Sequence, residues 1–410
     1  MLQKTSEMKV MRDVIHGYIH VDLQVIWDLI SAKEFQRLRR VHQLGGVFQV
    51  YHNAEHTRFS HSLGVYEIVR RMVYEIEGLD QQLSEREKAC VMMAGLLHDI
   101  GHLPFSHAFE TICDIPHEEF SKQIILGDSE VHCILCKYDA TLAQEVADII
   151  SYQHPNELLN QIVSGQLDAD RMDYLLRDAY FSGTSYGNFD LERILRTIRV
   201  KDNQLVVKES GIHSVEDYIM ARYHMYWQVY YHPVARSYEI ILRKIFKRMK
   251  EVYATKKEMF HNLEMFVPFL TGTPTISDHF ILDEPAAYYG FTLLCNKEDE
   301  ILQDLCRRLL NRNLFEYKSV HSQEDVDEIR NAVAKAGFDV RYYVKEDKTM
   351  QSPYLPYKAG DGHNVYVLSD TMDVSELSKK SVIVNSVVHG DIKEDKKVFY
   401  VKGEEESCWK

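Results

Sequence analysis

A histidine and an aspartate stand side by side at the end of an apolar stretch of this chain, in the segment AGLLHDIGHLPFSH. The stretch predicts a buried helix, and the glycine at position 101 is a typical signal for its end. Neighbouring helical residues point roughly 100° apart, so His98 and Asp99 can both reach one ion but cannot enclose it. Side chains from other segments must complete such a site. The pair therefore favours a fold that brings several helices to one point.

Two further candidate ligands lie in separate helical segments, His61 in TRFSHSLGVYE and Asp170 in LDADRMDYLLRDA. A single histidine of this kind is more often a hydrogen-bonded core residue, but the joint pattern favours a metal site. Imidazole and carboxylate ligands together suit manganese, iron, zinc, nickel or cobalt. An ion that keeps one coordination position open can activate water. We therefore predict one divalent transition metal ion, held by His61, His98, Asp99 and Asp170.

The composition of the 410 residues, 45% hydrophobic and 27% charged, is that of an ordinary globular protein. No stretch reaches the roughly 18 apolar residues of a membrane span, and the first residues lack the apolar core of a signal peptide. The seven cysteines have no framework spacing, which indicates reduced thiols. Cys133 and Cys136 form a CxxC without a second pair, which favours packed thiols over a structural zinc site. We therefore expect a cytoplasmic protein that does not enter the membrane.

The net charge of −14 argues against a broad nucleic-acid-binding surface. It leaves room for a local cationic pocket that binds a phosphate-rich small molecule. Basic residues do cluster between 33 and 40 and between 243 and 250. For the second cluster, the simplest interpretation is a solvated helix face.

Hydrophobic periodicity predicts that most of residues 22–265 are helical. The predicted helices cover 63–76, 84–100, a segment after Pro104, 141–153, 157–164, 171–180 and 213–252. Ser84-Glu85-Arg86-Glu87 fits a capping box at the start of the second of these. TIRVKDNQLVVK predicts a small β-hairpin with its turn at Asp202-Asn203. The expected class is therefore mostly α.

The pattern changes after about residue 265. The segment PFLTGTPTISD, at 268–278, contains two prolines and a glycine and is the expected boundary or lid. Beyond it, FDVRYYVK, NVYVLS and SVIVNSVV predict strands among short helices. We therefore expect a helical core over 1–265 and a smaller α+β lobe over 266–410.

Six motifs follow one another in a fixed order: DVIHGYIHVD, EFQRLRRVHQLGG, HTRFSHSLGVYE, LLHDIGHLPFSH, PHEEFS and DADRMDYLLRDA. In this order the chain resembles the HD-domain phosphohydrolase superfamily, whose metal ligands are a first His, an adjacent His-Asp pair and a late Asp. Within it, the chain is similar to the deoxynucleoside triphosphate (dNTP) triphosphohydrolase branch. The resemblance covers roughly residues 9–250 and thins through the C-terminal lobe. It implies an HD-domain core that hydrolyses dNTPs to deoxynucleoside and intact inorganic triphosphate.

The resemblance also implies which residues perform the reaction. His117 matches the family's acid-base histidine, Glu118 the carboxylate that orients it, and His102 a second catalytic histidine. Water attacks the α-phosphorus, and the leaving nucleoside oxygen needs a proton. A histidine suits proton transfer near neutral pH, above all when a carboxylate fixes its tautomer. Without the motif, His117 and Glu118 would be interpreted as a capping and surface pair.

Further positions match substrate-binding residues of the family. A triphosphate carries about four negative charges and requires Arg or Lys, with magnesium as a possible companion of the phosphates. The matching arginines are Arg58, Arg171, where some relatives carry Lys, and Arg222. The positions expected beside the deoxyribose and the base are Gln43, Leu44, Tyr174, Asp178 and Tyr230. A tyrosine under the sugar would help to exclude a 2′-hydroxyl, whereas the alternative role of Tyr230 is core packing.

Relatives in this branch bind a guanine nucleotide between the subunits of a tetramer, which activates catalysis. The matching positions here are Lys9, Gln36 and Arg39, so residues 1–45 are expected to make regulatory and subunit contacts. Ser31 stands where the vertebrate branch has an Asp that reads the guanine base, and a serine cannot accept two hydrogen bonds from that edge. The resemblance thus implies a dimer or tetramer with a GTP- or dGTP-type activator, and ordinary helix-face ion pairs are the alternative for the arginines.

Two other functions stay open at this point. One keeps the metal site but changes the substrate to a nucleoside monophosphate, a cyclic nucleotide or another phosphoester. The other is a non-catalytic nucleotide sensor or a nucleic-acid-binding scaffold, which the full set of ligands and the acidic net charge disfavour. The reaction products distinguish the first alternative, and tight binding without hydrolysis would indicate the second.

Overall fold

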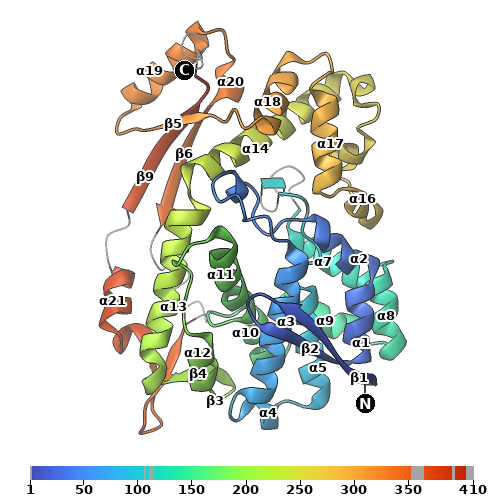
Figure 1. Cartoon of the computed structure of the whole chain (residues 1–410), viewed down its shortest axis with the longest axis vertical. Coiled ribbons are helices and arrows are strands. Elements are labelled where there is room, and N and C mark those ends of the chain that lie inside the picture. Colours follow the sequence, from blue (N-terminus) through green and yellow to red (C-terminus); the bar gives the residue numbers. More distant parts are fainter. Residues whose placement is uncertain (1, 106–107, 110–114, 352–363, 390–392, 403–410) are drawn as a thin grey trace.

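The computed structural model describes residues 2–105, 108–109, 115–351, 364–389 and 393–402 of the chain. The described part is mostly helical and contains three small sheets (Figure 1). The helices up to α13 lie in the lower half of Figure 1, and the long helix α14 leads into the upper half. The predicted mostly α class is therefore confirmed.

The chain begins with a hairpin of β1 (Lys4–Asp13) and β2 (Gly17–Leu23), which pair antiparallel. Gly17 has a φ of 71°, a left-handed conformation that glycine adopts without strain. The hairpin lies against α3, where the Tyr66 hydroxyl donates to the His20 carbonyl at 2.9 Å. No β1 side chain is fully buried, so no alternating apolar pattern marks this strand in the sequence.

The helices of the first half are α1 (Gln24–Ser31), α2 (Lys33–Arg37), α3 (Arg58–Glu75), α4 (Leu79–Gln82), α5 (Glu85–Leu97), α7 (His117–Leu126), α8 (Glu130–Tyr138), α9 (Leu142–Ile150), α10 (Glu157–Ser164), α11 (Ala169–Ser182), α12 (Leu191–Thr197), α13 (Ile212–Met225) and α14 (Pro233–Thr255). These helices include those predicted at 63–76, 84–100, 141–153, 157–164 and 171–180. The capping box formed by Ser84 and Glu87 is also confirmed.

Helices α3 and α5 form the centre of this half. Every residue of α5 from Lys88 to Leu97 is buried, and its apolar residues run around the whole circumference, as in other core helices. Helix α3 packs against both α5 and α11. This packing brings the start of α3, the end of α5 and the start of α11 together, and the polar residues of these helix ends meet there.

The single helix predicted over 213–252 is wrong. Helix α13 ends at Met225, residues 226–230 form a wider π-helical turn, and α14 begins at Pro233. A proline has no backbone N–H to donate to the preceding turn, so it starts a helix rather than continuing one. The helix predicted after Pro104 falls partly on 106–107 and 110–114, which lie outside the described residues.

The predicted hairpin is confirmed. Strands β3 (Ile198–Lys201) and β4 (Gln204–Lys208) pair antiparallel. The turn residues Asp202 and Asn203 both have a positive φ, as a two-residue hairpin turn requires. Strand β4 also pairs parallel with β7 (Tyr366–Leu368), which pairs antiparallel with β8 (Val374–Glu376). The strand expected in NVYVLS is therefore present, and it joins the helical half.

The strand predicted for SVIVNSVV is wrong, because these residues form α21 (Val382–His389). The Ser381 hydroxyl accepts a hydrogen bond from the backbone N–H of Val384 at 2.9 Å, which is a helix N-cap contact. Val384 is buried whereas Val382 is 81% exposed. Residues two apart thus face opposite ways, as they do on a helix and not on a strand.

The upper half contains α15 (Val267–Thr271), α16 (Ile276–Ile281), α17 (Glu284–Leu294), α18 (Glu300–Leu310), α19 (Gln323–Lys335) and α20 (Val340–Tyr343). Its sheet has the order β5 (Glu316–Ser319), β9 (Lys393–Tyr400), β6 (Val344–Gln351). The strand predicted for FDVRYYVK is wrong over its first part, because the Asp339 side chain caps α20 before β6 begins. The segment 268–278 holds the turn between α15 and α16. The division at 265/266 stays a prediction.

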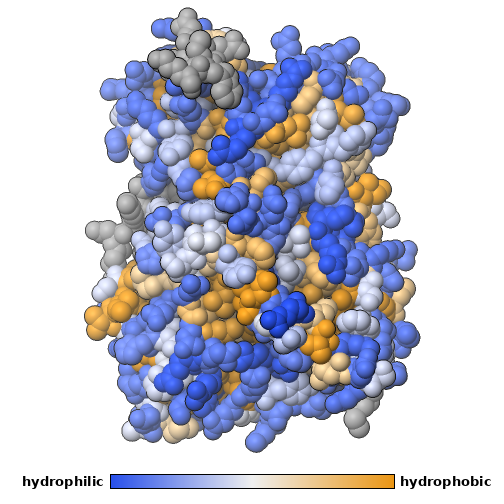
Figure 2. Space-filling view, in the orientation of Figure 1, coloured by the Kyte–Doolittle hydropathy of each residue, from blue (hydrophilic) through white to orange (hydrophobic). Residues whose placement is uncertain are grey.

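Hydrophilic side chains cover most of the face shown in Figure 2, and apolar side chains form separate patches. The N-terminal hairpin exposes Met8, Val10, Val14 and Tyr18. Among the described helices, none has the length and apolar content needed to cross a membrane. The five cysteines of the described part are free thiols, and Cys133 and Cys136 join no group of three metal-ligating side chains there.

Candidate active site

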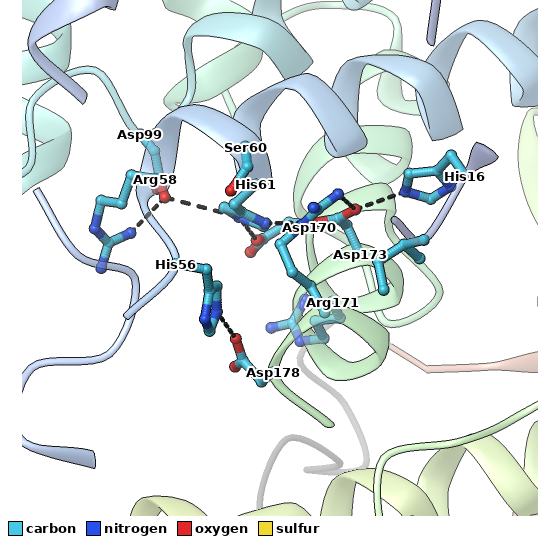
Figure 3. A network of polar contacts seen from close by, with 12 residues as sticks. His16, His56, Arg58, Ser60, His61, Asp99, Asp170, Arg171, Asp173 and Asp178 are labelled. Atoms are coloured by element: carbon cyan, nitrogen blue, oxygen red, sulfur yellow. Dashed lines mark hydrogen bonds and ion pairs between the residues drawn. The ribbon is translucent and has the colours of Figure 1, made fainter. Parts of the chain in front are cut away.

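The four predicted ligands converge where α3, α5 and α11 meet, and Figure 3 shows three of them, His61, Asp99 and Asp170. The Nε2 atom of His61 lies 3.0 Å from Asp170 Oδ1 and 3.7 Å from Asp99 Oδ2. The Nε2 atom of His98 lies 3.3 Å from Asp99 Oδ1 and 3.5 Å from Asp170 Oδ1. Ligand atoms of His61, His98 and Asp99 lie within 4.8 Å of one another. The structure thus brings together side chains that are up to 109 residues apart in the sequence.

The two histidines present their Nε2 atoms to the cluster. His61 Nδ1 lies 2.8 Å from Asp173 Oδ2, and His98 Nδ1 lies 2.9 Å from the Gly95 carbonyl. Because both partners accept hydrogen bonds, Nδ1 carries the proton in the neutral form of each ring, and Nε2 then offers a lone pair. The buried His98 Nε2 has no hydrogen-bond partner of its own. An orphaned imidazole lone pair facing two carboxylates fits a divalent cation.

Asp173 was not predicted from the sequence, although it supports the site. It is fully buried and contacts His16 Nε2 at 2.6 Å in addition to His61. Arg177 donates to both of its oxygens, and Arg177 in turn contacts Asp13 at 2.9 Å. The spacing of Asp170 and Asp173, three residues apart on one helix face, was the available signal. His16 and Asp13 lie in the DVIHG motif, so this N-terminal turn supports the candidate ligand His61 through Asp173.

The carboxylates of the cluster attract positive charge. Burial lowers the pKa of His61, but hydrogen bonds to Asp170 and Asp173 outweigh burial and raise this pKa to about 10. Burial also opposes the charge of Asp99, yet the Arg58 guanidinium and His98 hold the pKa of Asp99 well below its usual value. Such a site favours either an extra proton or a bound cation. The residues present therefore fit a divalent metal ion.

Arg58 and two histidines continue the cluster beyond Asp99. Arg58 forms a short, buried ion pair with Asp99, and His102 Nε2 lies 3.3 Å from Asp99 Oδ1. Burial and the neighbouring Arg58 hold the pKa of His102 well below its usual value, so its imidazole is neutral at pH 7. The rings of His102 and His117 stack with centroids 3.7 Å apart. His117 Nδ1 lies 3.3 Å from Glu118 Oε2, so the predicted acid-base pair borders the metal cluster.

A cavity of about 510 Å³ opens beside this cluster, within the usual size range of small-molecule sites. The predicted residues that line it are Gln43, Leu44, Arg58, Asp99, His102, His117, Glu118, Asp170, Tyr174, Asp178 and Tyr230. The wall also contains residues that were not predicted, namely Gly45, Val47, Phe105, Ala108, Tyr226, Tyr231, Arg236, Glu239 and Arg243. A second hollow of about 570 Å³ has four of the same residues in its lining, namely Asp99, His117, Glu118 and Asp170. His98 lines this second hollow as well. Two of the four candidate ligands, Asp99 and Asp170, therefore line both hollows.

One end of the cavity holds a fixed carboxylate. Asp178 Oδ2 accepts a hydrogen bond from the Tyr230 hydroxyl at 2.7 Å, and Asp178 Oδ1 lies 2.7 Å from His56 Nε2. The His56 ring stacks on Phe181 with centroids 4.6 Å apart. Tyr174 meets Tyr230 edge to face at 6.3 Å. Tyr230 therefore orients a polar residue of the cavity and is not only a core-packing residue, and His56 is a supporting residue that the motifs did not single out.

Two predicted phosphate ligands do not line the cavity. Arg171 forms an ion pair with the buried Asp168 and donates to the Gly165 carbonyl. Arg222 lies with its guanidinium 5.8 Å from the Tyr226 ring centre. Both charges act on Tyr174 of the cavity wall, where each opposes the rise that burial causes in the pKa of that tyrosine. The two arginines therefore stand behind the wall rather than in it.

The predicted regulatory residues are only partly brought together. Arg39 Nε donates to Gln36 Oε1 at 2.9 Å, and the Arg39 guanidinium stacks 3.5 Å from the Phe59 ring centre. Lys9 is on β1 and pairs with Glu7 at 2.9 Å. Ser31 is exposed and donates to the Trp27 carbonyl. Within this single chain, Gln36 and Arg39 form one contact, and Lys9 pairs with a different residue.

Comparison with protein families matches residues 58–178 to the HD domain and residues 189–266 to the HD associated region. The uncharacterized protein YwfO of Bacillus subtilis is 45% identical over 405 residues, which cover 97% of this chain and 93% of that protein. The deoxynucleoside triphosphate triphosphohydrolase SAMHD1 homolog of Dictyostelium discoideum is 34% identical, with 86% of this chain and 69% of the relative covered.

The fold also has solved counterparts. The crystal structure of a phosphohydrolase from Bacteroides thetaiotaomicron superimposes with a TM-score of 0.86 at 26% identity, covering 97% of this chain and all of the other. A hypothetical protein from Aquifex aeolicus gives a TM-score of 0.75 at 29% identity and covers 96% of this chain. These likenesses extend over both halves of the molecule, including the region beyond residue 266.

Proposed function

The chain belongs to the HD-domain family that includes the SAMHD1 deoxynucleoside triphosphate triphosphohydrolases, and from that premise we propose that it hydrolyses dNTPs to deoxynucleosides and inorganic triphosphate. One observation carries the proposal. The candidate ligands Asp99 and Asp170 border the same cavity as the acid-base histidine His117 and the aromatic wall with Tyr174. Candidate metal ligands and an aromatic wall that could bind a nucleoside thus border one cavity, which supports the proposal.

The nitrogen and oxygen donors of the four candidate ligands suit a divalent ion, and its chemistry determines what the ion would contribute. His61, His98, Asp99 and Asp170 would hold a divalent ion, which when bound supplies Lewis-acid polarisation of an α-phosphate oxygen and activation of water. Manganese, iron, zinc, nickel and cobalt all suit this set of nitrogen and oxygen ligands, and magnesium suits the phosphates themselves.

The protein's own side chains manage the proton that the leaving oxygen needs. His117 stands at the cavity wall with Glu118 beside its Nδ1. The carboxylate stabilises a protonated imidazole, which can then give a proton to the nucleoside oxygen as its bond to the α-phosphorus breaks. The neutral His102, stacked on His117, is placed to hydrogen-bond the α-phosphate. In this proposal His61 and His98 are metal ligands, whereas His102 and His117 act on the substrate.

The far wall of the cavity fits a deoxynucleoside. Tyr174 offers an aromatic face. The Asp178 carboxylate is held by Tyr230 and His56, and in this proposal it accepts a hydrogen bond from a sugar hydroxyl. Arg58 supplies positive charge at the border of the metal cluster. Arg171 and Arg222 reach the phosphates in this proposal only after their side chains leave the positions behind Tyr174. Arg171 must then exchange Asp168 for a phosphate, which its planar guanidinium can bind equally well.

Regulation is proposed on the same basis. Lys9, Gln36 and Arg39 would bind an activating nucleotide of the GTP or dGTP type between subunits of a dimer or tetramer. The exposed apolar side chains of the β1–β2 hairpin support a subunit contact at this end of the molecule. The free thiols of the described part support the cytoplasm as the proposed location.

The proposed function is tested by incubating the purified protein with manganese and all four dNTPs and separating the products by ion exchange. Deoxynucleosides together with intact triphosphate would support the proposal, and the order of consumption would reveal the preferred base. Orthophosphate or diphosphate as the first product would instead indicate another HD-family phosphohydrolase. If no nucleotide is consumed, even after GTP is added, the sensor alternative is favoured.

A further inference from the structure

The loop that carries His102 is held from behind by a buried arginine. Arg37 is 1% exposed. Its Nη1 donates to the His102 carbonyl at 2.8 Å, and its Nη2 donates to the Leu282 carbonyl at 2.6 Å. One rigid guanidinium fork thus joins the loop after α5 to the turn between α16 and α17. Burial lowers the pKa of Arg37 to about 9, so the guanidinium is still charged at neutral pH.

A histidine from the upper half reaches the same loop. His279 is fully buried on α16, and its Nε2 donates to the Gly101 carbonyl at 2.8 Å. The other side of Gly101 is pressed against α7, since a Cβ atom at this position would lie 2.2 Å from the His117 carbonyl. Figure 1 shows α16 close to α2 and α7. The loop is therefore enclosed between the helix that starts at His117 and the helix that carries His279.

The end of the loop is fixed by a buried carboxylate. Glu284, the first residue of α17, is 1% exposed and accepts hydrogen bonds from the backbone N–H groups of His42, at 2.9 Å, and Phe105, at 3.4 Å. Phe105 has a φ of 62°, which a bulky residue adopts only where its surroundings enforce it. Its ring packs on Tyr288 and Phe291 of α17. Helix α17 thus holds Phe105 in an unfavourable backbone conformation.

We propose that Arg37 of α2 and, from the C-terminal half, His279 and Glu284 are positioning residues, which fix the backbone of residues 101–105 and so set the place of His102 in the active site. The proposal rests on the function proposed above for His102 and assigns a role to the C-terminal lobe, which the motifs leave without one. All three side chains bond to backbone atoms of the loop rather than to one another. An ordinary core contact would not require three separate charged or polar groups to converge on five consecutive residues.

The position of Arg37 extends this role. It lies between Gln36 and Arg39, which belong to the proposed regulatory site, and Arg40 pairs with Asp283 at 2.5 Å. The segment 36–42 therefore contacts both the loop of residues 101–105 and the α16–α17 turn. Any ligand that reorders this segment would act on the loop through the same bonds.

The direct test is hydrogen exchange, measured by mass spectrometry on peptides that cover 97–105. In Glu284→Ala, we expect exchange in this segment to rise at least about 10-fold, because the loop opens locally without global unfolding. The matched control is Glu216→Ala. Glu216 is also a buried carboxylate, 7% exposed, that contacts a histidine, His213, at 2.7 Å, but it lies on α13 away from the loop. Unchanged exchange in Glu284→Ala would overturn the proposal.

Kinetics supply the second readout. We expect Glu284→Ala to lower kcat for dNTP hydrolysis about 10- to 100-fold with KM changed by less than about 2-fold, because a displaced catalytic group affects the chemical step more than binding. Bound metal should stay at the level of the unaltered protein. If the unaltered protein releases no triphosphate, the proposed function fails, and the exchange comparison alone decides the positioning role.

A second variant keeps the test decisive if Glu284→Ala does not fold. His279→Leu places an apolar side chain of similar size in the buried position and removes the donor to the Gly101 carbonyl. Faster exchange of the 97–105 peptides in this variant would support the proposal, provided that its thermal unfolding midpoint is at least as high as that of Glu216→Ala. Equal exchange in His279→Leu and the unaltered protein would contradict it.

Discussion

His61 Nδ1 lies 2.8 Å from Asp173 Oδ2, and neither side chain is accessible to solvent. This contact fixes the tautomer of the candidate ligand and raises the basicity of the ring nitrogen that faces the cluster. The same aspartate contacts His16 and is held by Arg177, so the N-terminal turn and α11 support the ligand together. The four candidate ligands are therefore supported by residues that are not themselves among the candidates.

Asp173→Asn should weaken metal binding while leaving the four ligands in place. The amide keeps the shape of the side chain but loses the charge that supports His61, and such changes cost about 10- to 100-fold in metal affinity. Competition with a chelator, followed by metal analysis, measures the effect. Asp139→Asn is the control, since Asp139 pairs with Arg86 on the surface at 2.8 Å. Equal affinities in all three proteins would show that this support is dispensable.

His117→Gln should separate metal binding from catalysis. His117 faces the cavity and stacks on His102 but is not among the proposed ligands. Loss of a general acid lowers the rate about 10²- to 10⁴-fold, so kcat should fall in that range with the metal content unchanged. Single-turnover rates and metal analysis of the same preparation check both points. A variant that retains more than half of its activity would remove His117 from the mechanism.

Tyr230→Phe should weaken substrate binding more than turnover. The variant loses the hydroxyl that donates to Asp178 at 2.7 Å, so the carboxylate is held by His56 alone. A hydrogen bond to a charged group contributes about 1.5–3 kcal/mol, so we expect KM for the dNTP to rise about 10-fold or more. Tyr289→Phe, at a 62% exposed position, is the control. An unaltered KM would assign Tyr230 to packing.

Stability should depend on pH through His42 and Glu284. Burial lowers the pKa of His42, but its hydrogen bond to Glu284 and the charge of that carboxylate outweigh burial and raise the pKa above the usual value. A pKa that is higher in the folded state stabilises the protein fully below the unfolded value of about 6.5, and this stabilisation is lost as the pH rises through the folded value. Urea denaturation should therefore show the largest stability difference between the unaltered protein and His42→Gln at acidic pH, shrinking as the solution becomes alkaline. A difference that grows with pH would contradict the pairing.

The helical core was predictable because its signals are local. Ser84 and Glu87 marked the start of α5, and Asp202-Asn203 marked the hairpin turn, since capping and turn chemistry depend on a few neighbouring residues. The strand prediction for SVIVNSVV was wrong because its β-branched residues favour strands by propensity. In the structure, the Ser381 cap and packing against α13 stabilise a helix instead. Likewise, Pro233 lay in an otherwise periodic stretch, and its effect outweighed that periodicity.

The sequence predicted four side chains that converge in the structure, but not the residues that support them. His98 and Asp99 are adjacent in the sequence, and the other ligands fall in recognisable motifs. Asp173, His56 and Glu284 act through partners 112, 122 and 242 residues away. No local pattern encodes such pairings, because they depend on how the helices pack.

The central claim is tested most directly by hydrolysis of a dNTP in ¹⁸O-labelled water, with mass analysis of both products. Attack on the α-phosphorus places one solvent oxygen in the triphosphate and none in the deoxynucleoside. We predict equimolar deoxynucleoside and singly labelled triphosphate from the unaltered protein, and neither product from His98→Ala. Label in the deoxynucleoside, release of orthophosphate or diphosphate, or full activity in His98→Ala would contradict the account.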